Sequence, residues 1–300
     1  MRTADGYTMN EIESSRFFVP ETFTPLFYTP LYDDLTPVQR LRYNQLHGCY
    51  CNEQIMFFEK FIAENVLTGL LHTKHAAPLL PQLRLFLDEE RRHARMFYEL
   101  NRLCLPRLYE RESLHFVRIP FGLKVLLNSL TSRPWFFPLF VWLMMLQEER
   151  AVFLGREILR LKEQIDPHFV ALQRVHLADE IGHVQWDQEI LAITWSKSSG
   201  RLRKLNAAML RGVLCEFAIT PKRANMRVIA ELVTEFPELM PRLPQLRRAL
   251  LMLGQDRDWN TSLYSRSTVP KTFAFFDRWP EFSSLSRVLC GYQPIGEMHG

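Results

Sequence analysis

Two stretches decide the fold of this chain: FLDEERRHARMFYEL at residues 86–100 and VHLADEIGHVQWDQEIL at residues 175–191. Both lack proline, contain little or no glycine and place apolar residues at helical intervals, so each predicts a helix. Positions i and i+3 lie on one face of a helix, so a glutamate and a histidine at that spacing point the same way. Each stretch contains one such pair: Glu90-x-x-His93 and Glu180-x-x-His183.

Two further glutamates extend this pattern. The sequence separation between Glu59 and Glu90 equals that between Glu149 and Glu180, so the second set repeats the first further along the chain. A four-helix bundle that holds two metal ions takes one Glu from each of two helices and a Glu-x-x-His pair from each of the other two. The spacing therefore predicts an all-α, ferritin-like four-helix bundle built around two metal ions.

A single Glu-x-x-His pair has little weight, because it arises readily by chance. Glu112-x-x-His115 is such a copy, with prolines on both sides and Pro81 where the matching upstream glutamate would stand. Glu90 and His93 differ because apolar residues share their side of the helix. Buried carboxylates and imidazoles require a partner, which favours metal ligands over a solvated helix surface.

The two single glutamates each have a competitor. Glu148 stands beside Glu149 after the apolar run WFFPLFVWLMMLQ, and only the equality of the two separations favours Glu149. In the first helix Glu53 competes with Glu59, which we favour for its spacing and its apolar neighbours. We therefore expect Glu59 and Glu149 to complete the set, with Glu53 as the alternative first ligand.

His176 adds a third imidazole to the pattern. With Glu180 and His183 it stands at i, i+4 and i+7, which forms one stripe along a helix. A shell of four carboxylates and three imidazoles suits iron, with manganese as the alternative. Asp88 and Asp179 lie close to the two motifs in sequence. They are candidates to hydrogen-bond the ligands and so orient them, although both also fit as surface acids.

Composition excludes several classes of function. The net charge of +4 is dispersed, and no basic block interleaves with aromatic residues, so we expect no nucleic-acid partner. The five cysteines are scattered without C-x-x-C spacing, which favours reduced thiols in a cytoplasm. The N-terminus has no apolar signal segment, and the apolar run 134–146 is too short to cross a bilayer. We expect a cytoplasmic protein without a membrane partner.

The chain is expected to form one domain of 300 residues with three parts. Residues 1–35 are rich in proline and aromatic residues and predict an extended arm, 36–197 the metal-binding bundle, and 198–300 accessory helices. Thr36 before Pro37 and Asp166 before Pro167 predict the starts of the first and fourth bundle helices. The bundle helices are expected at about 37–71, 77–103, 135–164 and 167–195, a shorter helix at 123–130, and accessory helices at 202–217, 223–236 and 239–253.

The ordered pattern of motifs, from Glu59 to His183, resembles the AurF/CmlI family of di-iron N-oxygenases, whose sites carry an extra histidine as His176 does here. The resemblance spans about residues 30–195. It implies a two-iron cofactor, O2 as co-substrate, and oxidation of a primary amine to a hydroxylamine, and it leaves open whether oxidation continues to nitroso and nitro products. It also implies an external electron donor such as a ferredoxin or a flavin reductase. The iron ligands it implies are Glu59, Glu90, His93, Glu149, His176, Glu180 and His183.

Other functions fit the same scaffold, because a fold does not determine its chemistry. The nearest alternative is a di-iron C-hydroxylase, desaturase or oxidase, and the seventh ligand favours N-oxygenation over these. An iron-storage protein is disfavoured by the long segment beyond the bundle. A metal-free helical interaction protein would require both spaced motifs to be accidents. For the oligomeric state we expect a homodimer.

Overall fold

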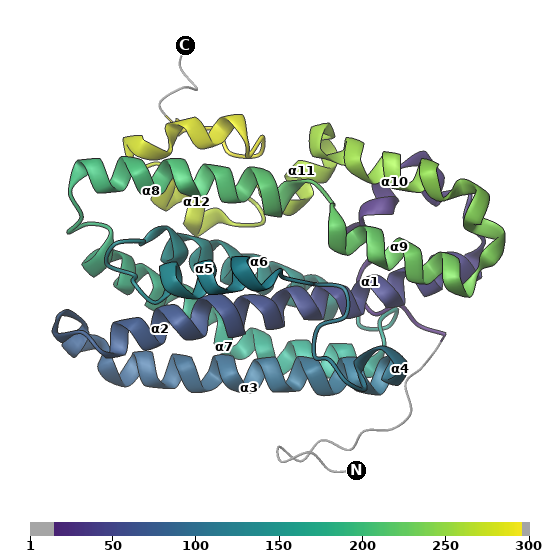
Figure 1. The fold of residues 1–300 in the computed structure, drawn as a ribbon, viewed down its shortest axis with the longest axis horizontal. Helices are drawn as coiled ribbons and strands as arrows, with labels where there is room; N and C mark the ends of the chain where they lie inside the picture. Colours follow the sequence, from purple (N-terminus) through teal and green to yellow (C-terminus); the bar gives the residue numbers. More distant parts are fainter. Residues whose placement is uncertain (1–14, 296–300) are drawn as a thin grey trace.

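A computed structural model describes residues 15–295, in which four long helices form a bundle. In Figure 1 α2 continues the line of α1, and α3 and α7 run lengthwise beside this long helix. The third bundle helix, α6, packs along α7, while α3 packs along α1, α2 and α7. The bounds are α1 Pro37–Phe58, α2 Glu64–Leu71, α3 Leu80–Cys104, α6 Leu139–Arg160 and α7 Pro167–Thr194.

The starts of the first and fourth bundle helices agree with the prediction. Thr36 caps α1 by accepting a hydrogen bond from the backbone of Gln39, whose side chain accepts in turn from the Thr36 amide. Asp166 caps α7 by accepting from the amide of His168. In both cases a side-chain oxygen satisfies an amide that has no partner within the helix.

The first bundle helix contains a π-helical segment that the residue pattern did not reveal. Glu59–Ala63 joins α1 to α2 without a break, and the amide of Glu64 bonds to the carbonyl of Glu59. Such a segment accommodates one extra residue within a helix and is frequent at functional sites. Here it begins at Glu59, one of the predicted ligands.

The remaining helices lie on the outside of the bundle. In Figure 1 α9 and α10 gather beside the start of α1, while α8 and α12 lie along one side of the molecule. The helices α8 and α12 pack against α6, and α9 packs against α1. Their bounds are α4 Pro106–Tyr109, α5 Phe121–Thr131, α8 Gly200–Val213, α9 Arg223–Glu235, α10 Leu243–Met252, α11 Arg257–Leu263 and α12 Pro270–Phe276.

The N-terminal segment packs over the body, but it is not extended. From residue 15 onward it winds through three short 3-10 helices, at Glu21–Phe23, Pro25–Tyr28 and Pro30–Tyr32. Asn44 on α1 anchors it by accepting from the amide of Phe18 and donating to a backbone carbonyl. Residues 1–14 of the expected arm lie outside the described residues, as do 296–300 at the other end.

The expected all-α class is confirmed. Among residues 15–295 the only β-type pairings are two isolated bridges, Phe17 with Ile165 and Ser265 with Gly291. No helix in the described part of the chain is long and apolar enough to span a membrane.

Candidate metal centre

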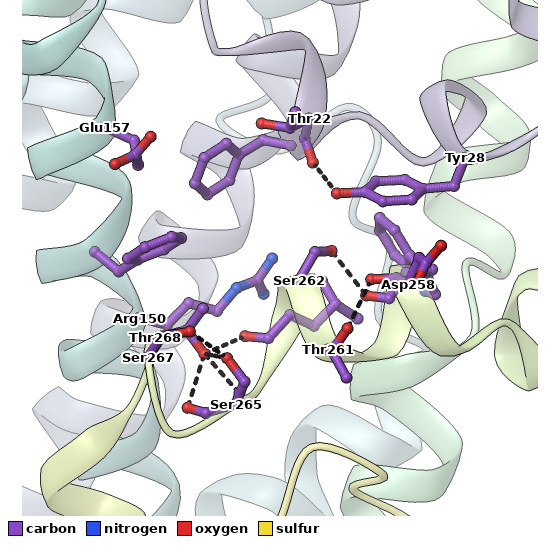
Figure 2. Close-up of a pocket in the computed structure, with 14 residues that line it drawn as sticks. Thr22, Tyr28, Arg150, Glu157, Asp258, Thr261, Ser262, Ser265, Ser267 and Thr268 are labelled. Carbon is purple, nitrogen blue, oxygen red and sulfur yellow. Dashed lines mark hydrogen bonds between the residues drawn. The ribbon is translucent and has the colours of Figure 1, made fainter.

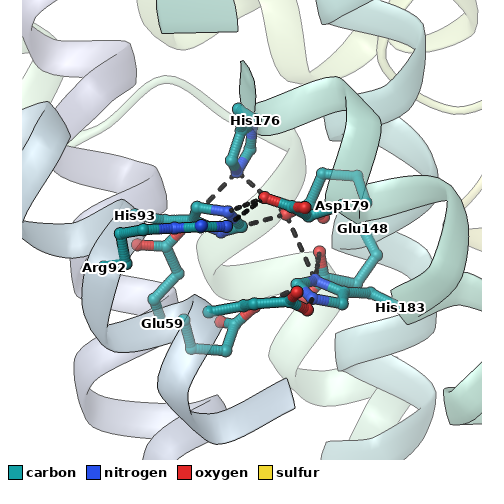
Figure 3. A network of polar contacts seen from close by, with 10 residues as sticks. Glu59, Arg92, His93, Glu148, His176, Asp179 and His183 are labelled. Atoms are coloured by element: carbon teal, nitrogen blue, oxygen red, sulfur yellow. Dashed lines mark hydrogen bonds and ion pairs between the residues drawn. The ribbon is translucent and has the colours of Figure 1, made fainter. Parts of the chain in front are cut away.

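Two overlapping groups of ligand-type side chains meet in the centre of the bundle (Figure 3). Within each group the potential ligand atoms all lie within 4.8 Å of one another, and every member is buried. The groups share His93 and Glu180, so together they form one continuous cluster. Its members are Glu59, His93, His176 and Glu180 in the first group, and Glu90, His93, Glu180 and His183 in the second.

Three helices bring these side chains together. Glu59 comes from the π segment, whereas α3 and α7 contribute the two Glu-x-x-His pairs and His176. On α7 the spacing of i, i+4 and i+7 aligns His176, Glu180 and His183 on one face, as expected. The cluster therefore contains six of the seven residues predicted as ligands.

The distances within the cluster are those of groups that could surround a shared cation. The Nε2 atom of His176 lies 2.9 Å from Oε1 of Glu180 and 3.4 Å from Oε1 of Glu59. His183 presents its Nδ1 atom 3.1 Å from Oε1 of Glu90 and 3.3 Å from Oε1 of Glu180. The Nδ1 atom of His93 lies 3.4 Å from the same Glu180 oxygen.

Most of these atoms have no hydrogen-bond partner despite their proximity. Both carboxylate oxygens of Glu59, Glu90 and Glu180 are buried and unpartnered within the described residues. The Nδ1 atoms of His93 and His183 are also unpartnered. Burying such groups without partners is costly, on the order of 1–3 kcal/mol for a neutral group and more for a charge. Metal ions between them would satisfy all of these atoms, so the residues present fit a two-metal centre.

Two carboxylates outside the cluster hold its histidines in place. Nε2 of His93 lies 2.9 Å from Asp179, and Nε2 of His183 lies 3.0 Å from Glu89. A proton on each Nε2 leaves the Nδ1 lone pair facing the cluster, which is the arrangement of metal-binding histidines. The guanidinium of Arg92 also binds Asp179.

The structure places the predicted supporting acids differently. Asp179 lies where expected, but Asp88 is exposed to solvent and does not reach the cluster. Glu89 takes the corresponding place and was missed. The available signal was symmetry, because Glu89 directly precedes Glu90 as Asp179 directly precedes Glu180.

On the third bundle helix the structure places Glu148 at the cluster, and not Glu149, which was predicted as the ligand. Glu149 turns away from the cluster and accepts hydrogen bonds from the amides of Lys271 and Thr272, at 2.7 and 2.8 Å, at the start of α12. Glu148 instead faces the cluster, with Oε2 3.9 Å from Nδ1 of His183 and its Oε1 unpartnered. Burial, together with the neighbouring carboxylates of Glu180 and Glu90, raises the pKa of Glu148 well above its ordinary value.

The physical reason is that equal spacing across a loop does not fix which face of a helix a residue occupies. One residue turns an α-helix by about 100°. The chain between Glu59 and Glu90 passes through the π segment and a 3-10 helix, Lys74–Leu79, whereas Glu148 and Glu180 are joined by a plain turn. The same sequence separation therefore leads to different faces in the two halves.

Glu53, the alternative first ligand, has a different role. Its carboxylate accepts hydrogen bonds from the hydroxyl of Tyr109 and from the amides of His115, Phe116 and Val117. Burial raises its pKa and these hydrogen bonds oppose that rise. Glu53 thus holds the loop after α4 against α1, and Glu59 is the glutamate of this helix that lies in the cluster.

The buried cluster retains protons when no cation is present. Burial raises the pKa of Glu59 to about 8; His176 opposes this rise, whereas the carboxylates of Glu90 and Glu180 add to it. Burial disfavours the charged form of His176, but Glu180 and Glu59 outweigh it and raise the pKa of that imidazole to about 10. The carboxyl of Glu180, surrounded by imidazoles, has a pKa well below its ordinary value despite burial.

Asp187, one helical turn beyond His183 on α7, was not singled out from the sequence. It is fully buried, and neither carboxylate oxygen has a hydrogen-bond partner among the described residues. Burial raises its pKa well above the ordinary value, although the charge of His183 opposes the rise. Asp187 is thus a further buried carboxyl group close to the cluster. The other carboxyl groups in or beside the cluster are Glu59, Glu89, Glu90, Glu148, Asp179 and Glu180.

A comparison with known protein families found a match. The family model described as p-aminobenzoate N-oxygenase AurF matches residues 8–238. The chain belongs to this family. Membership makes the protein an oxygenase, and the expectation based on the order of motifs is confirmed. A search of curated proteins found no significant match.

Proposed function

We propose that this member of the AurF family binds two iron ions in the cluster and uses O2 and external electrons to oxidise the nitrogen of a primary amine. The observation that carries the proposal is the pair of overlapping ligand groups, with their buried, unpartnered oxygens and nitrogens. Family membership supports the reaction class.

The ligand set that we propose differs from the predicted one at a single position. Glu148 replaces Glu149, because its carboxylate faces His183 while that of Glu149 is held by α12. Glu180 belongs to both groups of potential ligands. The proposed ligands are Glu59, Glu90, His93, Glu148, His176, Glu180 and His183.

Two iron ions held there would supply two electrons together for the reduction of O2, while the protein orients their ligands and keeps water away. Asp179 and Glu89 fix the two Nε2 protons of the Glu-x-x-His pairs, as described above. Apolar rings close the surroundings. Phe86 stacks on the imidazole of His183 with ring centroids 4.1 Å apart, and Phe97 meets His176 edge-on at 4.9 Å. Both rings are fully buried, so they shield the cluster from bulk solvent.

The substrate and the electron donor are further parts of the proposal. The description of the family makes p-aminobenzoate the first amine to test. We propose a ferredoxin or a flavin reductase as the donor, because the reaction consumes electrons that the chain itself does not supply.

The test is turnover by iron-reconstituted protein supplied with p-aminobenzoate, reductant and isotopically labelled O2. The expected products are the hydroxylamine and its nitroso and nitro successors, with label on the nitrogen. Glu148→Gln should abolish the product, and Glu149→Gln should retain it. Label on carbon instead of nitrogen would replace the proposal with a C-hydroxylase on the same scaffold.

A further inference from the structure

A pocket away from the metal cluster is shown in Figure 2. It is a pocket of about 440 Å³, lined by α6, by the N-terminal segment around Thr22–Tyr28, and by α11 with the turn that follows it. Three consecutive residues of α6 define its position. Glu148 faces the cluster, Glu149 binds the start of α12, and Arg150 lines the pocket.

Helix geometry separates this pocket from the cluster. Successive residues of an α-helix point about 100° apart, so Glu148 and Arg150 point to nearly opposite sides of α6. A ligand in this pocket would therefore be divided from the metal centre by the helix itself, and its binding does not depend on the proposed function.

Arg150 is the decisive group. Figure 2 shows its guanidinium reaching into the middle of the pocket. The guanidinium carbon lies 5.5 Å from the centre of the Tyr264 ring, and within residues 15–295 no carboxylate pairs with it. A half-buried guanidinium presents five N–H donors in a planar fork, and this fork matches a carboxylate with two parallel hydrogen bonds.

The walls of the pocket determine which chemical groups the ligand has besides its anionic group. Phe23, Tyr28, Phe153 and Trp259 supply aromatic surface on several sides. The hydroxyl of Tyr28 already donates to Thr22, and those of Thr261 and Ser262 donate to backbone carbonyls of α11. With those hydrogens committed, Arg150 is the group that attracts an anion, because among the described residues it is the one cationic side chain that lines the pocket. The aromatic rings offer flat apolar surface to the rest of the ligand.

Two acids at the pocket limit the charge of the ligand. Glu157 is paired with Arg160, and Asp258 is exposed, yet both leave negative charge on the lining. These charges disfavour a doubly charged phosphate more than a single carboxylate, because like charges repel even where solvent screens them.

We propose that this pocket binds a small aromatic carboxylate, with the carboxylate in the fork of Arg150 and the ring between the aromatic walls. The ring would gain apolar contact with Phe153 and Trp259, while the charge-assisted hydrogen bonds would fix its orientation.

The test is calorimetric titration of the full-length, metal-free protein with benzoate. Saturable binding is expected, and Arg150→Gln should weaken it roughly ten- to hundred-fold, because hydrogen bonds to charged groups contribute about 1.5–3 kcal/mol. Arg156→Gln is the matched control, since it removes the same charge from an exposed position of α6 and should leave benzoate affinity unchanged. Thermal unfolding of Arg150→Gln verifies that the variant is folded.

Three comparisons complete the test. Neutral benzamide and inorganic phosphate should each bind more weakly than benzoate. Glu148→Gln should bind benzoate like the unsubstituted protein, which would place the ligand away from the cluster. The proposal is overturned if benzoate shows no saturable binding, if Arg150→Gln binds it equally well, if phosphate binds more tightly, or if Glu148→Gln alone abolishes binding.

Discussion

At the scale of single residues, Glu148 and Glu149 show how adjacent and chemically identical side chains acquire separate roles. Glu148→Gln should lower metal affinity by more than roughly 10- to 100-fold, which is the typical cost of removing a residue that only hydrogen-bonds a metal ligand. Glu149→Gln should retain metal but lower the free energy of unfolding by about 1–3 kcal/mol, because two amides of α12 lose a charged acceptor. Metal analysis and denaturant unfolding measure both effects. A metal-free Glu149→Gln protein would contradict the assignment.

The protons held by the cluster predict a pH dependence of metal binding. Glu59, with a pKa raised to about 8, and His176, with a pKa raised to about 10, must each lose a proton before a cation enters. Affinity should therefore rise with pH by up to about tenfold per unit for each displaced proton between about pH 6 and 8. Titration calorimetry in buffers of different ionisation enthalpy measures proton release. Affinity independent of pH would show that the groups are already deprotonated.

The raised pKa values of Glu59 and His176 also determine whether metal-free protein becomes more or less stable as pH rises. Both folded-state pKa values lie above the unfolded ones, so the folded chain binds more protons across this window. The stabilisation is complete below the unfolded values and is lost as pH rises through the folded values. Metal-free protein should accordingly become less stable as pH rises above neutrality, which thermal unfolding at several pH values would measure.

At the scale of elements, the first bundle helix separates a structural carboxylate from a metal-facing one. Glu53→Gln should lower the free energy of unfolding by about 3 kcal/mol, because an amide cannot accept all the hydrogen bonds that bind the loop after α4. Its iron content should remain that of the unsubstituted protein. Glu59→Gln should have the opposite effects. It should lose metal, while the free energy of unfolding of the metal-free protein stays the same or rises. Equal metal loss in both variants would refute the distinction.

The elements also show where sequence reasoning succeeded. Thr36 and Asp166 identify helix starts because capping is a local interaction between a side chain and the next amides. The His176, Glu180 and His183 stripe was predictable because helical periodicity within one helix is rigid. The π segment at Glu59–Ala63 was not, because nothing local distinguishes EKFIA from an ordinary helical turn.

At the scale of the whole molecule, the unpredicted features depend on segments far apart in sequence. Glu149 is fixed by Lys271 and Thr272, which lie far along the chain on α12. Glu53 is likewise fixed by the loop after α4, whose backbone pattern has no sequence signature. The sequence pattern predicted the bundle and the six residues of the cluster. Which of the adjacent Glu148 and Glu149 faces the cluster depends on tertiary contacts, which the pattern does not contain.

The cluster should also contribute to the stability of the whole fold. A cation that binds only the folded state stabilises it by about 2.7 kcal/mol at a free concentration of 100 times Kd. Removing metal with a chelator should therefore lower the unfolding temperature of the unsubstituted protein, and Glu148→Gln should hardly respond. Calorimetric unfolding with and without chelator measures the difference. An unchanged unfolding temperature in the unsubstituted protein would indicate that no metal had been bound.

The most direct test of the central claim is a crystal structure of anaerobically iron-reconstituted protein, with anomalous scattering recorded at the iron absorption edge. The account predicts two anomalous peaks per chain in the cluster, with Glu148 among their ligands and Glu149 still bound to the amides of Lys271 and Thr272. No anomalous peak in the cluster, or ligation through Glu149 instead of Glu148, would contradict it.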